Sequence, residues 1–171
     1  MKASQLSKNE YAQYYSNYIN KAGEEMLVSG LESSLSSILA FFNTIPENKL
    51  EYRYDAGKWT VKDIIQHLID AERVFAYRAL RFARQDKTSL PGFEENTYTD
   101  VANANKRSRA ELLKEYQLVR ESTIMLFKSF NEDALKLVGV ASNSNMSVRA
   151  IGFVIIGHEK HHCEVITSRY L

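Results

Sequence analysis

The sequence predicts an all-α protein, a bundle of four long helices preceded by a short N-terminal helix. The chain of 171 residues has only two prolines and seven glycines, which leaves long uninterrupted segments between them. Four of these segments repeat apolar residues every three or four positions, as one face of a helix does. A chain of this length suits one domain, spanning residues 1–171, and can bury a sizeable core.

The composition excludes several classes of protein. Lys and Arg number 22 against 21 Asp and Glu, with no basic block, so we expect no nucleic-acid partner and no anionic membrane surface. The longest apolar run, residues 150–157, is far shorter than the roughly 20 residues of a membrane span. The N-terminus lacks the apolar core of a signal peptide. One cysteine, Cys163, excludes an internal disulfide, and we expect a cytoplasmic protein.

The N-terminal part is predicted to hold one short and one long helix. Residues 7–21 are rich in tyrosine at a spacing of three or four, and Ser7 and Glu10 have the spacing of a capping box. Residues 24–43 carry the apolar stripe of the first long helix. Residues 46–58 are expected to connect it to the next helix.

Residues 60–85 are predicted to form the second long helix. Thr60 and Asp63 have the spacing of an N-terminal cap. His67 lies in about the second turn, on the side that we expect to face inward. That side also carries Ile64, Leu68, Ala71, Phe75, Ala79 and Phe82.

The stretch 86–104 shows little periodicity and contains Pro91 and Gly92. Long loops inside compact domains are uncommon and often functional. We expect this one to span the bundle and start a helix on another side. It carries Glu94, Glu95 and Tyr98, which are candidates for proton transfer or substrate contact.

The C-terminal part supplies the last two long helices. Residues 108–130 have an apolar stripe and a capping box formed by Ser108 and Glu111. Residues 131–146 are expected to connect them to the final helix, which Ser147 caps and which runs to the C-terminus. The chain has no internal repeat.

Three of the four histidines lie in the final helix, and two of them share one face. His158 and His162 are four residues apart and follow the stripe of Ile151, Ile155 and Ile166 toward the core. A buried imidazole needs a polar partner, and two histidines at this spacing can bind one metal ion. The bundle would bring His67 against them, giving three neutral imidazoles and an open position for Zn²⁺, Ni²⁺ or Fe²⁺.

Other interpretations of these residues remain open. The histidines could be hydrogen-bonded core residues without a metal. Glu159 and His162 form one E-x-x-H motif, but a di-iron bundle needs a second, which is absent. His161 points about 100° from His162 and is expected to be solvated or at a helix seam.

The neighbouring acidic and thiol groups are expected to have ordinary roles. Asp70 could orient an imidazole, but we expect Asp70 and Glu72 to form a solvated acidic row. Cys163 is expected to be a small residue in or at the edge of the core.

Three stretches together resemble the DinB-like superfamily, also called YfiT-like metal-dependent hydrolases. They are GKWTVKDIIQHLIDAE at 57–72, LPGFEENTY at 90–98 and GHEKHH at 157–162. The resemblance covers most of the chain. It implies a four-helix bundle with a crossover connection, a divalent metal held by His67, His158 and His162, and a homodimer.

The resemblance also implies a class of chemistry. Characterised relatives include bacillithiol S-transferases and the mycothiol-dependent maleylpyruvate isomerase. We therefore expect a metal-dependent thiol S-transferase or hydrolase that acts on a small-molecule substrate, with a low-molecular-weight thiol as a possible partner. The alternative is a non-catalytic, stress-related bundle that binds metal.

Overall fold

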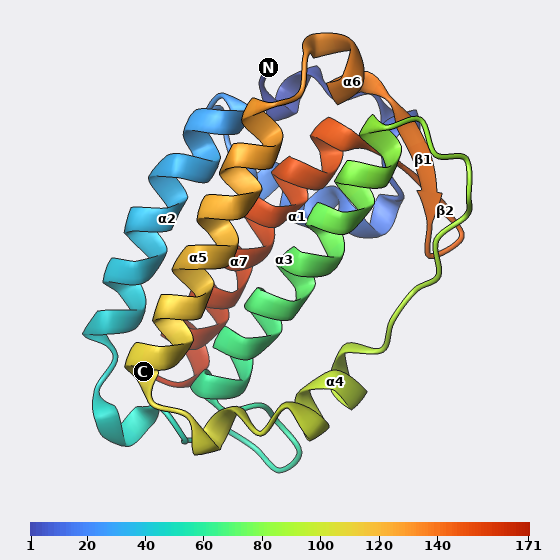
Figure 1. Cartoon of the computed structure of the whole chain (residues 1–171). Helices are drawn as coiled ribbons and strands as arrows, with labels where there is room; N and C mark the ends of the chain where they lie inside the picture. Colours follow the sequence, from blue (N-terminus) through green and yellow to red (C-terminus); the bar gives the residue numbers. More distant parts are fainter.

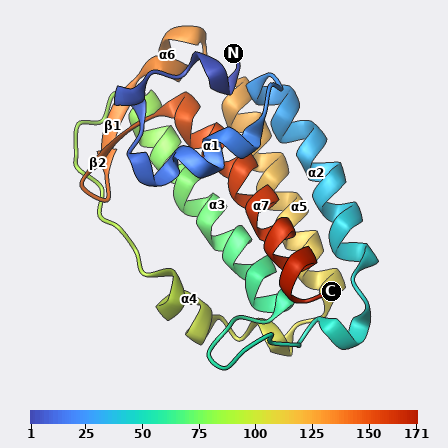
Figure 2. The same cartoon turned by 180° about the vertical axis from the view of Figure 1, so that it is seen from behind.

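The computed structural model describes all residues, 1–171, and its main body is a bundle of four long helices (Figure 1). These are α2 (Leu27–Thr44), α3 (Val61–Ala83), α5 (Arg109–Lys128) and α7 (Val148–Arg169). The short helix α1 (Ser16–Ala22) crosses the face of α7, as Figure 2 shows from behind. The predicted fold class is confirmed.

Neighbours in the sequence are not neighbours in the bundle. Both α2 and α3 pack against α5 and α7, so α2 and α3 occupy opposite corners. Figure 1 shows α3 and α5 running in the same direction, with α2 and α7 running in the opposite one. The chain must therefore travel the length of the bundle between α3 and α5, which is the expected crossover.

Local capping explains where the long helices begin. The Thr60 hydroxyl accepts a hydrogen bond from Asp63 N at 3.0 Å, and the Asp63 carboxylate accepts one from Thr60 N at 2.9 Å. Ser108 and Glu111 form the same reciprocal pair at α5. Ser147 Oγ accepts from Ala150 N at the start of α7. All three predicted caps are confirmed.

The first fifteen residues differ from the prediction. The predicted helix over 7–21 begins only at Ser16, because residues 3–5, 8–10 and 13–15 form separate 3₁₀ turns. The Ser7–Glu10 capping box exists, but it caps the turn at 8–10. Glu10 is also bound by Arg149 at 2.6 Å and by Ser147 Oγ at 2.8 Å, which ties this segment to the start of α7.

Both long connectors contain regular structure that the periodicity did not indicate. The crossover carries α4 (Glu95–Ala102) and a 3₁₀ turn at 104–106. The stretch 131–146 carries α6 (Glu132–Lys136) and a hairpin of β1 (Val138–Ala141) and β2 (Ser144–Ser147), with Val138 opposite Ser147. Leu90 N donates to Val140 O at 2.9 Å, which attaches the crossover to the edge of the hairpin.

A buried arginine connects all four long helices at mid-bundle. Arg120 on α5 is 1% exposed and binds Glu72 on α3 through two hydrogen bonds of 2.8 Å. It also donates to Glu159 on α7 at 2.7 Å and to Ser34 on α2 at 2.6 Å. Tyr116 donates to Glu159 at 2.6 Å. We call these five residues the Arg120 network.

The expectation of a solvated Glu72 is therefore wrong. Its carboxylate is 3% exposed and faces the interior. Asp70, in contrast, is partly exposed and accepts a hydrogen bond from Gln66, not from an imidazole. The inward position of Glu72 follows from its partner, because a buried carboxylate is tolerated only where a cation and further hydrogen bonds compensate it.

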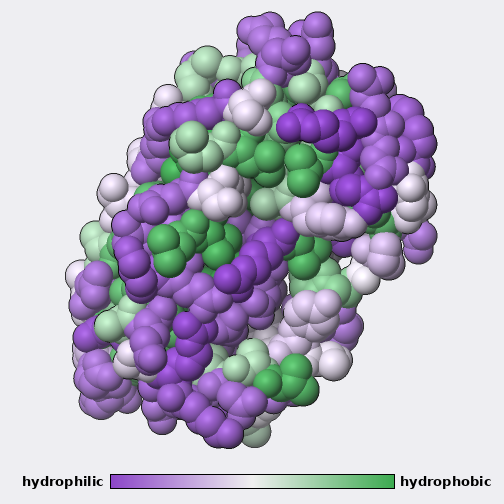
Figure 3. Space-filling model, viewed as in Figure 1, coloured by the Kyte–Doolittle hydropathy of each residue, from purple (hydrophilic) through white to green (hydrophobic).

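No single helix is long and apolar enough to cross a membrane. One bent pair, residues 13–22 with 27–44, reaches that threshold by length and composition alone. In the view of Figure 3, hydrophobic residues form small groups among hydrophilic ones. Helix α5 contributes two of the exposed apolar side chains, Leu118 and Met125.

Replacing the buried arginine tests the importance of the network. Arg120→Met should lower the free energy of unfolding by about 3–5 kcal/mol, because two buried carboxylates lose their cation. Urea unfolding at pH 7 measures this. Arg73→Met, which removes an arginine that is 49% exposed, should cost less than about 1 kcal/mol. Similar costs for both variants would contradict the role assigned to the network.

Candidate metal centre

Three imidazoles from two helices meet in the interior. His67 lies on α3, and His158 and His162 lie on successive turns of α7, as their spacing predicts. His158 Nε2 is 3.0 Å from His67 Nε2 and 3.0 Å from His162 Nε2. One ligand nitrogen from each histidine lies within 4.8 Å of the other two.

Hydrogen bonding alone cannot satisfy this arrangement. The Nε2 atom of a neutral imidazole carries either one proton or one lone pair. His158 Nε2 can therefore form a good hydrogen bond with only one of its two neighbours. A cation at the common point would accept all three lone pairs at once. Three nitrogens about 2.0–2.1 Å from such an ion stand roughly 3.3 Å apart in tetrahedral geometry, close to the spacing seen here.

The surroundings keep the imidazoles neutral. Burial lowers the pKa of His67 to about 4. Burial, followed by repulsion from the neighbouring histidines, places the pKa of His158 and of His162 well below the ordinary value. Neutral imidazole is the form that donates a lone pair to a metal. At pH 7 all three groups are therefore ready to act as ligands.

Close packing of α1 against α7 orders one side of this cluster. A Cβ on Gly157 would lie 1.7 Å from Tyr18 O, so only glycine permits the observed approach. The Tyr18 ring then stands 5.2 Å from His158 and 5.4 Å from His161, each edge to face. On the other side, the Trp59 ring lies 4.7 Å from His67.

The three histidines open into a cavity of about 400 Å³. Its walls come from the N-terminal segment, α3, the crossover and the hairpin, and they include Tyr15, Tyr18, Phe75, Arg78, Phe93 and Glu95. The cluster is thus buried but reachable. No Cys, Asp or Glu joins the three histidines within ligand distance.

The crossover residues singled out from the sequence divide into two kinds. Glu95 lines the cavity. Glu94 is exposed and caps α4 by accepting a hydrogen bond from Asn96 N. Tyr98 is 46% exposed, and its ring is tilted against that of Phe93, with the ring centroids 5.2 Å apart.

Two other candidate ligands are directed elsewhere. The carboxylate of Glu159 is bound by Arg120 and Tyr116, so the single E-x-x-H motif does not deliver a carboxylate to the histidines. Burial raises the pKa of Cys163 to about 12, so this thiol is protonated at pH 7. His161 is only partly buried, as expected for a helix seam.

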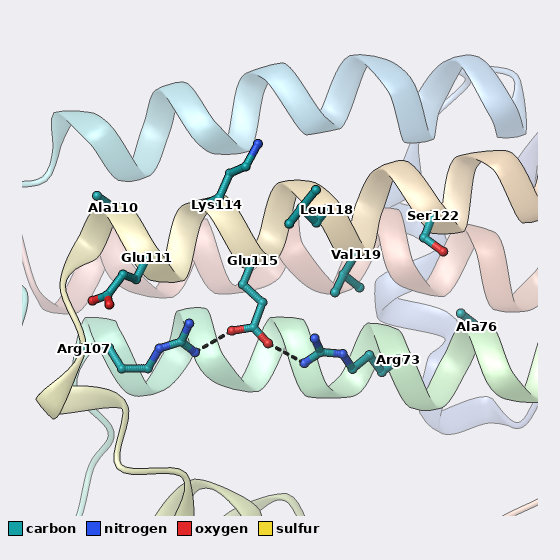
Figure 4. Close-up of a pocket in the computed structure, with 10 residues that line it drawn as sticks. All are labelled: Arg73, Ala76, Arg107, Ala110, Glu111, Lys114, Glu115, Leu118, Val119 and Ser122. Atoms are coloured by element: carbon teal, nitrogen blue, oxygen red, sulfur yellow. Dashed lines mark ion pairs between the residues drawn. The ribbon is translucent and has the colours of Figure 1, made fainter.

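A larger groove of about 830 Å³ lies on the outside, between α3 and α5 (Figure 4). Glu115 crosses it and pairs with Arg73 and Arg107, at 2.6 Å in each case. Both arginines are therefore already paired, and no histidine or cysteine lines this groove. The cavity above the histidines is the better candidate for chemistry.

Sequence reasoning missed Arg78 as a cavity residue. It lies three residues after Phe75 and four before Phe82, on the inward stripe of α3, yet it is charged. A cation on an apolar stripe is a detectable signal. The contributions of the N-terminal turns and the hairpin had no such signal, because they depend on the tertiary arrangement.

Comparison with known proteins agrees with this architecture. The sequence model described as "DinB superfamily" matches residues 31–166. The chain superposes on YfiT from Bacillus subtilis with a TM-score of 0.72 at 16% identity, covering 83% of this chain and 82% of that one. That protein is described as "a probable metal-dependent hydrolase with an unusual four-helix bundle topology". No curated protein matches the sequence.

The lowered histidine pKa values predict how the metal-free chain responds to acid. Because His67 titrates near 4 when folded and near 6.5 when unfolded, only the unfolded chain gains its proton between these values. The free energy of unfolding should therefore be greatest above pH 6.5 and fall as the pH decreases. Each such histidine contributes a slope of about 1.4 kcal/mol per pH unit.

The measurement is urea unfolding in chelator at pH 7.5, 6.5 and 5.5. His67→Gln should reduce the slope below pH 6.5 by about 1.4 kcal/mol per unit. His161→Gln, at a less buried imidazole, should reduce it less. An unchanged slope in His67→Gln would show that this imidazole is not held neutral by the fold.

Proposed function

The chain belongs to the DinB superfamily, and from that premise we propose that it is a divalent-metal-dependent enzyme acting on a small molecule. The convergence of three Nε2 atoms on one point carries the proposal, since hydrogen bonds cannot satisfy all three. His67, His158 and His162 would hold Zn²⁺, Ni²⁺ or Fe²⁺.

The absence of a fourth protein ligand favours an enzyme over a structural metal protein. Structural zinc sites are closed by four protein ligands, whereas catalytic sites keep one position open. Here no carboxylate or thiol joins the histidines, and the cluster faces a cavity of about 400 Å³. A divalent ion in this position supplies Lewis acidity, which lowers the pKa of a coordinated water or thiol.

The protein groups around the site supply positioning and proton transfer. The aromatic walls formed by Tyr15, Tyr18 and Phe75 reduce access of water and strengthen electrostatic interactions inside. Burial raises the pKa of Tyr18 well above its ordinary value, so its hydroxyl is a neutral donor or acceptor at pH 7. Glu95 is the carboxylate of the cavity wall and our candidate proton acceptor.

Two reactions fit these groups, and we favour transfer of a thiol to an electrophile over hydrolysis. No cysteine thiol lines the cavity, since Cys163 is absent from its walls. In this proposal the nucleophile enters with the substrate or from solvent. In hydrolysis, water is the nucleophile. Glu94, which caps α4, and Tyr98, on α4, are exposed and do not line the cavity, so they would contact the substrate or its partner and not the reacting atoms.

The second candidate function is a metal-binding bundle without turnover. A homodimer is compatible with either function, and the partly apolar groove between α3 and α5 is a candidate dimer surface (Figure 4).

Metal content tests the first step of the proposal. Protein purified without chelator or metal-affinity resin should contain about one divalent ion per chain. His67→Ala and His162→Ala, on different helices, should each bind the ion at least about a hundredfold more weakly, because each removes one of three ligands. Elemental analysis and metal titration measure this. Loss in one variant but not in the other would contradict a shared site.

Turnover tests the second step. The metal-loaded chain should conjugate a small thiol to a chlorodinitrobenzene electrophile, and His158→Ala should lose at least about a hundredfold in rate. Absorbance of the product follows the reaction, and p-nitrophenyl acetate reports hydrolysis in parallel. A metal-loaded wild type that accelerates neither reaction, nor any of a wider set of thiols and electrophiles, would favour the non-catalytic candidate.

A further inference from the structure

The cavity contains a buried cation without an acidic partner. The Arg78 side chain is 3% exposed, yet it takes part in no ion pair within 4.0 Å. Its Nη2 donates hydrogen bonds to two uncharged acceptors, Pro91 O at 3.0 Å and Ser142 Oγ at 3.1 Å. Arg120, which is 1% exposed, is held by two carboxylates. Arg78 is therefore unlike Arg120, the other buried arginine, whose charge is compensated by carboxylates.

None of its neighbours cancels this charge. The Phe75 and Phe93 rings stand 5.8 and 5.9 Å from the guanidinium and offer only cation–π attraction. Burial raises the pKa of the nearby Tyr15, which is thus an uncharged phenol at pH 7. Burial lowers the pKa of Arg78, but an arginine remains protonated in proteins. Glu95 lines the same cavity without forming an ion pair with it.

Arg78 and the three histidines line the same cavity, and Arg78 and His67 lie on different turns of α3. Arg78 lies eleven residues after His67, which is three turns or about 16 Å of helix. Helical side chains lean toward the N-terminus, so the guanidinium is directed from its own turn back toward the histidines. Between them the cavity is walled by Ala71, Phe75 and Tyr15. A small elongated molecule would reach both ends.

We propose that Arg78 binds an anionic group of the substrate, which makes the substrate class a small carboxylate-bearing molecule with an apolar middle. The far end of that molecule would lie at the histidines, so this assignment rests on the proposed function for its reacting end. A carboxylate supplies the charge that Arg78 lacks, and a guanidinium binds carboxylates through charge-assisted hydrogen bonds. The aromatic walls would contact the apolar middle.

A tryptophan in the cavity wall allows ligand binding to be followed by fluorescence. Trp59 is the one tryptophan of the chain and lines the cavity beside His67, so its fluorescence can follow occupancy without a metal. Hexanoate and hexan-1-ol serve as probes, since they share an alkyl chain and differ in charge. Titrations of metal-free protein in chelator measure the contribution of Arg78 to binding in the absence of an ion at the histidines.

The metal-free wild type should bind hexanoate at least about tenfold more tightly than hexan-1-ol. Arg78→Gln keeps a donor for Pro91 O but loses the charge, and should abolish the preference. Arg78→Lys should retain part of it. Arg73→Gln, on the outer face of the same helix, should behave as wild type. Circular dichroism confirms that each variant is folded.

Equal binding of the two probes by the wild type, including no binding of either, would overturn the assignment. So would a preference that persists in a folded Arg78→Gln. If Arg78→Gln does not fold, the wild-type preference and Arg78→Lys still decide the matter. A preference for hexanoate in a chain that binds no metal would reject the proposed function and leave the anion site standing. Metal binding by a chain that shows no preference for hexanoate would support the proposed function and reject the anion site.

Discussion

The hydrogen bonds of Arg120 are the constraint on which the rest of the structure depends. One guanidinium reaches Ser34, Glu72 and Glu159, which lie on three other helices. Because these partners are fixed in direction as well as distance, each helix is held in one rotation about its axis. Glu159 follows His158 directly, so holding its carboxylate on the Arg120 side sets where the adjacent imidazole points. A purely apolar core would tolerate more slippage between helices.

The same network shapes the electrostatics of the histidine cluster. Arg120 is one cation between two carboxylates, Glu72 and Glu159, and these three residues share a small void with His158. A nearby negative charge in a low-dielectric interior favours a cation. The imidazoles themselves are kept neutral by burial. A surplus of negative charge beside three convergent lone pairs is an arrangement that a divalent ion relieves.

The features of the fold and of the histidine cluster that have a local cause were predictable from the sequence. The caps at Thr60, Ser108 and Ser147 follow from residues three positions apart, and the pairing of His158 with His162 follows from one turn of helix. The fold class and the inward position of His67 follow from periodicity. Helix α4 was missed because its eight residues are too few to repeat an apolar stripe, and the inward Glu72 because its cation is 48 residues away. The cavity walls come from segments that only the fold brings together.

X-ray absorption spectroscopy of the zinc-loaded chain tests the central claim most directly, because it reads the ligands of the ion itself. We predict three nitrogen neighbours at about 2.0–2.1 Å with the outer-shell scattering of imidazole rings, and one further oxygen neighbour that exchanges with added ligand. Fewer than three imidazoles, or a sulfur neighbour at about 2.3 Å, would contradict the proposal that His67, His158 and His162 together hold one ion.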